Sequence, residues 1–330
     1  MKKFLIIQTA FIGDVILATA VVEKLHEYYP DAAIDFLLRK GNESLLDNNP
    51  YLREVLIWDK KKNKHSNLLK IAKQVRTTEY DYVINLHRFA TSGLVALMSG
   101  AEHKIGFDKN PLSFAYTKKY IHEIGNGFHE TDRNQQLIKD ITDNTAAKPK
   151  LYPSNNDFEK ARQLTEGLEK YICIAPASVW FTKQFPVVKW LELIERLNSV
   201  ALKIFLLGAP GDKGMCEEII SRSSNKNIKN LAGQLSFLQS AALMKGAAMN
   251  FVNDSAPLHI CSAMNARTTA IFCSTVPAFG FGPLADGAVI LESKENLSCR
   301  PCGLHGYAAC PKGHFKCALS VEVSGLRFGV

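Results

Sequence analysis

The chain lacks the features of a membrane-spanning or secreted protein. None of its apolar runs is long enough to cross a bilayer, and the apolar N-terminal segment is too short for a secretory signal and has no cleavage-site pattern. It also has no Walker motif, no dinucleotide-binding glycine fingerprint and no recognised nucleic-acid-binding motif. We therefore expect a cytoplasmic protein with no nucleic-acid partner.

The composition is that of a folded protein with a basic balance. The 330 residues are 46% hydrophobic and 22% charged, and this length suits two α/β domains. Lys and Arg number 40 against 32 Asp and Glu, an excess of 8 that suits phosphates or an anionic membrane face. Disulfides are not expected in a reducing compartment, although half of the 8 cysteines lie within residues 299–317.

Apolar β-branched runs alternate with helical patterns along the whole chain, which is typical of parallel sheets. A Lys- and Asn-rich passage at 142–157, with two prolines, divides the pattern and predicts a linker. We therefore expect one domain over 1–153 and a second over 154–330. The expected strands are 3–8, 33–38, 54–59, 81–86, 171–176, 202–208, 248–254 and 268–273. The expected helices are 13–28, 42–49, 67–78, 129–141, 158–169, 187–199, 213–223, 235–247 and 257–265.

Gly13 and Asp14 stand between the first expected strand and a long amphipathic helix. Asp14 is an ordinary residue type for a helix N-cap, with Gly13 supplying a tight turn before it. A carboxylate held at the carboxyl end of a parallel strand is also well placed to act as a catalytic base. Both interpretations stay open from this motif alone.

Further polar residues follow the other expected strands, at the end of the sheet where ligands of parallel-sheet domains bind. A helix N-terminus, small residues and a lysine together suit a phosphate ligand. These residues are Ser178 and Lys183 in the loop 175–186, Asp212 in the turn 207–214, and Asp254 and Ser255 before the helix at 257–265.

The order of these segments resembles glycosyltransferase family 9, the bacterial lipopolysaccharide heptosyltransferases. The resemblance covers nearly the whole chain, and residues 253–263 ("NDSAPLHICSA") are close to the family's D-[ST]-G-P-x-H-x-x-[AS]-A. Two departures are Ala256, where glycine is usual, and Ala177 before Ser178, where glycine is common.

The resemblance implies the GT-B fold, in which two Rossmann-like domains face each other across a cleft. It implies metal-independent, inverting transfer of a heptose from ADP-heptose to a phosphorylated lipid A core acceptor, with peripheral contact at the inner face of the cytoplasmic membrane. The first domain would bind the acceptor and the second the nucleotide-sugar donor.

The resemblance also implies roles for individual residues. Asp14 would be the base, and Lys183 would stabilise the leaving diphosphate. The donor-binding residues would be Gly13, Ser178, Lys183, Asp212, Asp254, Ser255, Ala256 and His259. The acceptor-binding residues would be His87, Arg88, Lys104 and Arg133, with His129 nearby.

Cys299, Cys302, Cys310 and Cys317 form a pattern that resembles a zinc site. The spacing of 7 and then 6 residues after the Cys-x2-Cys pair departs from ordinary zinc fingers, so a cluster of reduced thiols is the alternative. Two alternatives to heptosyl transfer also stay open at this point: a different nucleotide sugar as donor, and a non-catalytic sugar-nucleotide or glycan-binding protein.

Overall fold

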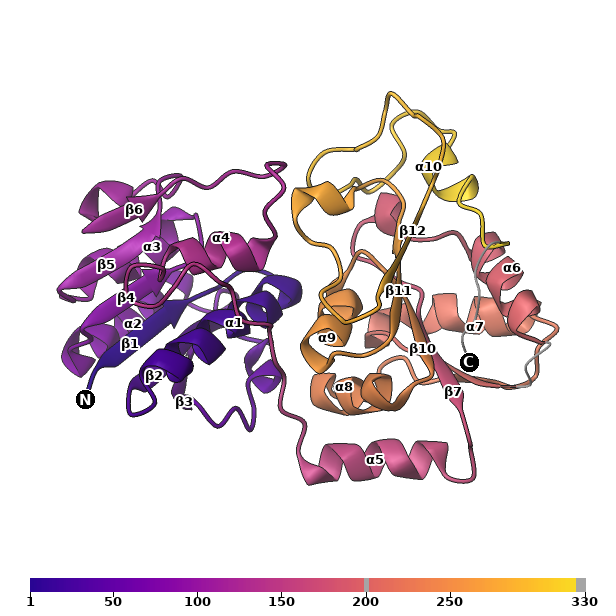
Figure 1. Cartoon of the computed structure of the whole chain (residues 1–330), viewed down its shortest axis with the longest axis horizontal. Coiled ribbons are helices and arrows are strands. Elements are labelled where there is room, and N and C mark those ends of the chain that lie inside the picture. The colour runs from indigo at the N-terminus through magenta and orange to yellow at the C-terminus, as the bar shows by residue number, and fades with distance from the viewer. Residues whose placement is uncertain (199–201, 325–330) are drawn as a thin grey trace. The chain divides into compact units, whose positions relative to one another are not determined.

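The computed structural model describes residues 1–198 and 202–324. The end of the helix expected over 187–199 lies outside these residues. The chain forms two compact units, Met1–Tyr152 and Pro153–Val330 (Figure 1). Each unit contains one parallel six-stranded sheet with helices on its faces.

The first unit is built on a sheet of order β3-β2-β1-β4-β5-β6. Its elements are β1 (Lys3–Ile7), α1 (Ile12–Tyr28), β2 (Ala33–Arg39), the 3₁₀ helix η1 (Glu43–Leu45), β3 (Leu52–Trp58), α2 (Lys64–Thr78), β4 (Tyr82–Asn85), α3 (Ala90–Met98), β5 (His103–Phe107), η2 (Ser113–Ala115), β6 (Lys118–Tyr120) and α4 (Glu130–Gln136).

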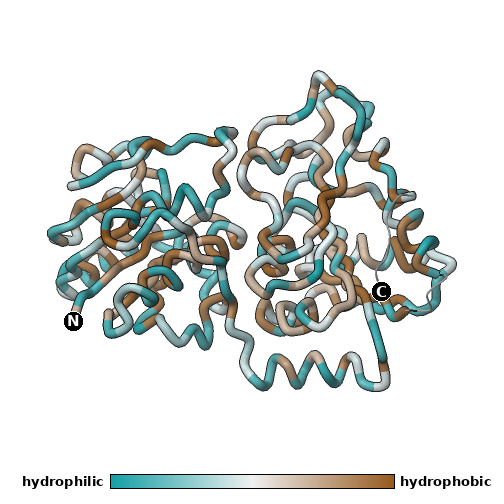
Figure 2. The backbone as a smooth tube through the Cα atoms, viewed as in Figure 1, coloured by the Kyte–Doolittle hydropathy of each residue, from teal (hydrophilic) through white to brown (hydrophobic). Residues whose placement is uncertain are grey.

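The two faces of β1 bury different partners because side chains of a strand alternate between faces. Leu5 and Ile7 belong to one apolar cluster with residues of α2 and α3, whereas the Phe4 ring lies 5.2 Å from that of Tyr29, just after α1. The central strand is thus apolar on both faces, as strands of parallel sheets are. Figure 2 shows hydrophobic segments along the strands, whereas the outer helix α5 is largely hydrophilic.

The second unit repeats this plan with sheet order β12-β11-β10-β7-β8-β9. Its elements are α5 (Asn155–Thr165), β7 (Tyr171–Ala175), η3 (Phe181–Lys183), α6 (Val187–Leu197), β8 (Lys203–Leu206), η5 (Pro210–Asp212), α7 (Lys213–Arg222), β9 (Ile228–Asn230), α8 (Phe237–Gly246), β10 (Met249–Asn253), α9 (Ala256–Met264), β11 (Thr268–Phe272), η6 (Pro277–Phe279), β12 (Val289–Glu292) and α10 (Lys316–Leu319).

The central strand β7 is again buried on both faces. Ile172 and Ile174 share one apolar cluster with residues of α6 and α7. On the other face the Tyr171 hydroxyl donates to the main-chain oxygen of Leu243 in α8, at 2.7 Å. The second unit therefore has the same layered core as the first.

Several elements differ from the sequence-based expectation. The helix expected at 42–49 is only the 3₁₀ helix η1, and strands β5, β6, β9 and β12 are not among the expected strands. Edge strands such as β6 ("KKY") and β9 ("IKN") are short and polar, so main-chain pairing rather than an apolar pattern defines them. The helix expected from 158 begins three residues earlier, because Ser154 and Asp157 form a capping box.

The strand order reverses at the same place in both sheets. In each unit, counted in chain order, the third, second and first strands lie on one side and the fourth, fifth and sixth on the other. The reversal lies between β1 and β4 in the first unit and between β7 and β10 in the second. The loops that leave the carboxyl ends of these four strands are therefore the expected ligand sites of the fold.

Candidate functional site

Asp14 lies in the first turn of α1, beyond the carboxyl end of β1. The interpretation of Asp14 as the N-cap is wrong by position, because the helix begins at Ile12 and Phe11 is the N-cap. Gly13 likewise lies within the first helical turn and not in a turn before it. The Asp14 carboxylate instead accepts a hydrogen bond from the Phe11 main-chain N–H at 3.1 Å, which fixes the start of the helix.

The environment of Asp14 raises the pKa of its carboxyl group to about 6. Burial is the largest cause, and the negative charge of Glu130 adds to it. The hydrogen bond from Phe11 and the positive charge of Arg88 act in the opposite direction. Asp14 is thus ionised at neutral pH, yet it is a stronger proton acceptor than an ordinary aspartate.

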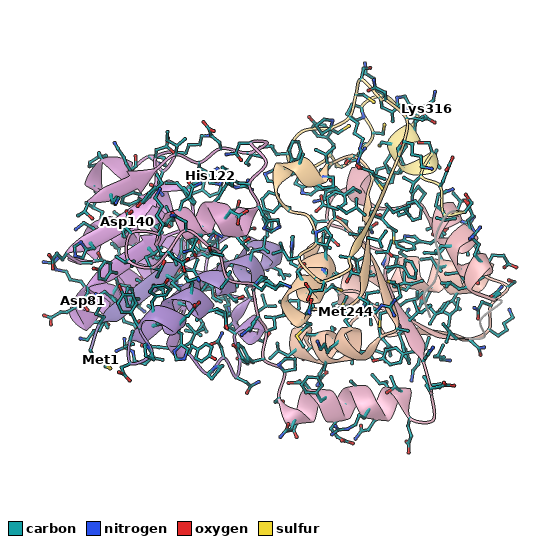
Figure 3. All side chains as sticks on the ribbon, in the orientation of Figure 1. Met1, Asp81, His122, Asp140, Met244 and Lys316 are labelled. Atoms are coloured by element: carbon teal, nitrogen blue, oxygen red, sulfur yellow. The ribbon has the colours of Figure 1, made fainter. Side chains whose placement is uncertain are left out.

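A buried network of charges connects to Arg88, which follows β4. The Arg88 guanidinium lies 3.4 Å from Nδ1 of His122, and His122 Nε2 lies 3.7 Å from the Glu130 carboxylate. Figure 3 labels His122, which is 1% exposed. Arg133 donates to Glu130 at 2.8 Å and to the main-chain oxygen of Phe128 at 2.6 Å, and the positive charges lower the pKa of Glu130. Sequence reasoning missed His122 and Glu130.

His87 lies two residues after the end of β4 and is buried. Its Nδ1 lies 2.9 Å from the Thr9 hydroxyl, which joins the loops after β1 and β4. Burial, helped by the charges of Lys60, Arg88 and Arg39, lowers the pKa of His87 to about 4. The ring is therefore neutral at pH 7, and Arg88 is the cation of this pair.

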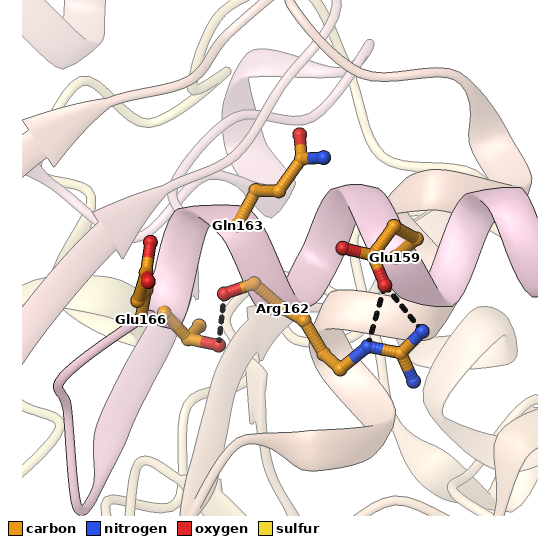
Figure 4. A pocket seen from close by; sticks show the side chains of 5 residues that line it. Glu159, Arg162, Gln163 and Glu166 are labelled. Atoms are coloured by element: carbon orange, nitrogen blue, oxygen red, sulfur yellow. Dashed lines mark hydrogen bonds and ion pairs between the residues drawn. The ribbon is translucent and has the colours of Figure 1, made fainter.

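Lys104 lies apart from these loops. Lys104 is at the amino end of β5, and its ammonium donates to the main-chain oxygen of Ala101 at 2.7 Å. In the second unit, a hollow of about 380 Å³ lies on α5. Figure 4 shows Arg162 and Glu159, which form an ion pair there. The ion pair is exposed, and the residues that line the hollow all come from α5 or directly follow it: Glu159, Arg162, Gln163, Thr165 and Glu166.

In the second unit, Lys183 and Asp254 meet at the carboxyl ends of β7 and β10. The Lys183 ammonium lies 2.8 Å from the Asp254 carboxylate, and the same oxygen accepts a hydrogen bond from the Thr275 hydroxyl at 2.6 Å. Lys183 and Asp254 are 15% and 7% exposed, so solvent screens the pair only in part. Three separate loops thus place one cation, one carboxylate and one hydroxyl together.

Asn253 joins the loop after β7 to the end of β10. Its amide donates to the main-chain oxygen of Pro176 at 2.7 Å and accepts from the N–H of Phe185 at 3.0 Å. The side chain is fully buried, so both bonds are protected from water. The sequence motif points to Asp254, the residue after Asn253. The role of Asn253 is visible only in its contacts with the loop after β7.

The helix α9 begins at Ala256, with Ser255 as its N-cap residue. Ser255 makes no side-chain cap bond, and the Asp254 carboxylate contacts Lys183 and Thr275 instead of the helix start. His259 is buried one turn into α9. The N–H groups of a helix start and its dipole favour an anion at this point.

Two further expected donor residues have local roles in the structure. The Ser178 main-chain oxygen accepts from the Gln184 amide at 2.6 Å. The Asp212 carboxylate accepts from the Ala209 N–H at 2.7 Å and so shapes the turn after β8. Both residues belong to loops at the carboxyl edge of the second sheet.

The four C-terminal cysteines lie in the segment between β12 and α10 or in α10 itself. All 8 cysteines of the chain are free thiols. The Cys299 sulfur lies 3.8 Å from His314 Nε2, and burial raises the pKa of Cys317 to about 11. Within residues 1–198 and 202–324, no three His, Cys, Asp or Glu side chains are arranged to hold a metal ion.

The sequence profile of Glycosyltransferase family 9 (heptosyltransferase) matches residues 68–305. Lipopolysaccharide heptosyltransferase 3 of Escherichia coli (strain K12) is 28% identical over 280 residues, which cover 81% of this chain and 81% of that protein. Lipopolysaccharide core heptosyltransferase OpsX of Haemophilus influenzae is 23% identical over 275 residues, covering 82% and 79% of the two chains.

Solved structures show the same fold. E. coli ADP-heptose lps heptosyltransferase II has a TM-score of 0.77 at 20% identity, covering 93% of this chain and 92% of that one. E. coli heptosyltransferase WaaC with ADP has a TM-score of 0.72 at 17% identity, covering 87% and 92%. The iron-containing dodecameric glycosyltransferase TibC of enterotoxigenic E. coli has a TM-score of 0.57 at 14% identity, covering 96% and 72%.

Proposed function

The chain belongs to glycosyltransferase family 9 and is a glycosyltransferase with the GT-B fold, and we propose that it transfers a heptose from ADP-heptose to the inner core of lipopolysaccharide with inversion at the anomeric carbon. Relatives named as lipopolysaccharide heptosyltransferases support the sugar and the acceptor. The structure of WaaC with ADP supports the nucleotide.

The observation that carries this proposal is the chemistry at the two sheet reversals. At one lies Asp14, a carboxylate whose pKa is raised to about 6, beside the charge of Arg88. At the other lie the Lys183 ammonium and the first turn of α9. Group transfer from a nucleotide sugar needs a base for the acceptor hydroxyl and positive charge for the leaving diphosphate.

In the proposed reaction, Asp14 accepts the proton of the acceptor hydroxyl while that oxygen attacks the anomeric carbon. The new carbon–oxygen bond forms on the face opposite the diphosphate, and the bond to the phosphate oxygen breaks with its electron pair leaving on ADP. Lys183 and the N–H groups at the start of α9 stabilise the charge that develops there. Asp254 holds Lys183, and its carboxylate is also available to hydroxyl groups of the donor sugar.

We assign the acceptor to the first unit and the donor to the second. Arg88 and Arg133 are the cations of the first unit that suit a phosphorylated or carboxylated acceptor. Ser178, Asp212, Ser255, Ala256 and His259 line the loops that we assign to the donor. Lys104 is proposed only as a peripheral acceptor contact, since it lies at the opposite end of its strand.

The proposed acceptor is a lipid-linked oligosaccharide, so we infer peripheral contact with the cytoplasmic face of the inner membrane. The charge excess of 8 is consistent with an anionic surface. No helix in the described part of the chain is both long enough and apolar enough to span a membrane.

We propose that the transfer step itself requires no metal. Cys299, Cys302, Cys310 and Cys317 are the residues whose thiolates would hold a structural zinc, but their arrangement in the structure offers no ready set of ligands. The relative TibC is described as iron-containing, so elemental analysis of the untagged protein should measure both metals. No step of the proposed reaction passes through this segment.

A thermal-shift series with different nucleotides, followed by a transfer assay, tests the proposed function. A ligand that binds only the folded state raises the melting temperature more the tighter it binds. We expect ADP to stabilise the protein more than UDP or GDP, and ADP-heptose to be consumed only with a lipid A core acceptor. Stronger stabilisation by UDP would identify another sugar donor, and binding without turnover would indicate a sugar-nucleotide-binding protein.

A further inference from the structure

The Cys-rich segment, residues 299–317, contacts the turn that carries Lys183. The Thr182 hydroxyl accepts a hydrogen bond from the N–H of Tyr307 at 2.8 Å, and the Thr182 N–H donates to the Tyr307 main-chain oxygen at 3.1 Å. Thr182 is 1% exposed and precedes Lys183 directly. Both main-chain groups of Tyr307 thus bond to Thr182 and join the segment between β12 and α10 (Figure 1) to the Lys183 turn.

The same segment contacts the loop after β11. The N–H of Cys302 donates to the main-chain oxygen of Ser274 at 2.8 Å, and the Arg300 guanidinium donates to that of Thr275 at 2.9 Å. Residues 300–307, which we call the clamp, therefore span the two loops that position the Lys183–Asp254 pair.

The two loops are also joined to each other by two side-chain connections. The Ser274 hydroxyl donates to the Thr182 hydroxyl at 3.0 Å. Lys183 follows Thr182 in the chain, and Thr275 follows Ser274. Both contact the Asp254 carboxylate, Lys183 at 2.8 Å and Thr275 at 2.6 Å. The result is a closed ring of contacts in which the position of Thr182 determines the position of Lys183.

Gly306 precedes Tyr307 in the clamp and lies close against this ring. Its φ of +77° belongs to the left-handed region that favours glycine. A Cβ atom at this position would lie 2.8 Å from the Thr182 hydroxyl and 3.0 Å from Cγ of Lys183. A side chain at 306 would therefore displace the Lys183 turn or the clamp.

We propose that the clamp is a positioning device for Lys183, with Thr182 and Gly306 as its positioning residues. The clamp proposal rests on the proposed function, because the proposed function assigns Lys183 to the leaving diphosphate. A small displacement of a group that stabilises the transition state lowers the rate by up to ~10²-fold, even when the displacing change lies outside the reacting groups. The Cys-rich segment then contributes to the donor site through its main chain, independently of any metal at its thiols.

Gly306→Ala, with Gly287→Ala as control, tests the clamp. Gly287 has a similar φ of +67° in the same unit, but a Cβ there meets nothing within 4 Å. We expect Gly306→Ala to lower ADP affinity and kcat by ~10-fold or more while AMP affinity changes little, since AMP lacks the terminal phosphate. Gly287→Ala should leave ADP affinity, AMP affinity and kcat as in the wild type.

A second pair of variants, Thr182→Val and Thr182→Ser, tests whether the clamp positions Lys183 if Gly306→Ala unfolds. Valine keeps the shape but removes the acceptor of two buried hydrogen bonds, whereas serine keeps the hydroxyl. We expect valine to reproduce the loss of ADP-over-AMP preference and serine to restore it. A merely structural role would lower the melting temperature of the valine variant without changing this preference.

The wild type separates failure of the clamp from failure of the proposed function. A wild type that binds no ADP and consumes no ADP-heptose would contradict the proposed function. A wild type that does both, together with Thr182→Val or folded Gly306→Ala variants that keep the ADP-over-AMP preference and kcat, would overturn the clamp alone.

Discussion

The carboxyl groups of Asp14 and Glu130, in the first turns of α1 and α4, interact so that the charge of Glu130 raises the pKa of Asp14. Arg88 opposes this effect from the loop after β4, and His122 and Arg133 lower the pKa of Glu130 itself. Burial is the largest cause of the raised pKa of Asp14, and the charges of Glu130 and Arg88 adjust it in opposite directions.

Asp14→Asn should abolish most transfer while leaving ADP binding nearly unchanged. The amide keeps the size of the side chain and can still accept from the Phe11 N–H, but it cannot act as a base. Loss of a general base commonly lowers the rate by ~10²–10⁴-fold. Single-turnover rates and ADP titrations measure the two effects. Turnover close to that of the wild type would return Asp14 to a structural role at the helix start.

The pH dependence of kcat/KM should reveal the pKa of Asp14 in the free enzyme. The rate should fall with decreasing pH through about 6, because protonation removes the base. Glu130→Gln removes a negative charge and should move this acid limb to lower pH. Arg88→Gln removes a positive charge and should move it to higher pH. Shifts in the same direction for both variants would contradict the assignment of the limb to Asp14.

The parts of the site that could be predicted from the sequence are those at the ends of strongly apolar strands. Asp14, Lys183 and Asp254 follow β1, β7 and β10, whose buried patterns are clear in the sequence. The family resemblance is confirmed by the profile match over residues 68–305 and the fold by the solved structures. The residue roles and the domain assignments stay predictions.

The residues that the sequence did not reveal act through contacts between distant segments. His122 meets Arg88 from 34 residues away, and Tyr307 meets Thr182 from 125 residues away. No local pattern encodes such pairs, because a buried histidine or threonine has the same neighbours in sequence whether or not it contacts a functional loop. The helix expected at 42–49 is wrong beyond Leu45, because Asn48 has a φ of +61°, which a right-handed helix does not contain.

Lys183→Ala should weaken binding of ADP much more than binding of AMP. The ammonium lies at the carboxyl end of β7, paired with Asp254, and a lysine ammonium acts as a point charge on a phosphate. The substitution also removes the ammonium that pairs with the buried Asp254 carboxylate, which keeps the hydrogen bond from the Thr275 hydroxyl. The melting temperature of the variant should therefore be measured alongside. Calorimetric titrations with both nucleotides measure the effect. Equal loss of affinity for ADP and AMP would show that Lys183 does not contact the terminal phosphate.

Asn253→Ala and Asn250→Ala should separate stability from donor binding. Both asparagines are fully buried in β10 and donate to main-chain oxygens, but Asn253 lies at the carboxyl end of the strand and Asn250 near its amino end. Each substitution should lower the free energy of unfolding by about 1–3 kcal/mol, as loss of a buried polar partner does. Only Asn253→Ala should also weaken ADP binding, because it releases the loop that carries Lys183. Equal effects on ADP binding would place the donor elsewhere.

Transfer should survive removal of divalent cations. The proposed donor site already supplies the Lys183 ammonium and the start of α9 to the leaving diphosphate, and these groups remain when a chelator is added. We expect the initial rate of protein dialysed against EDTA to stay within about twofold of the untreated rate, a difference of less than ~0.5 kcal/mol in the activation free energy. Measuring the melting temperature of the same samples distinguishes a structural metal at the Cys-rich segment, whose loss would lower the melting temperature. A rate that falls on chelation and returns with added Mg²⁺, at an unchanged melting temperature, would show that a metal ion takes part in the transfer step.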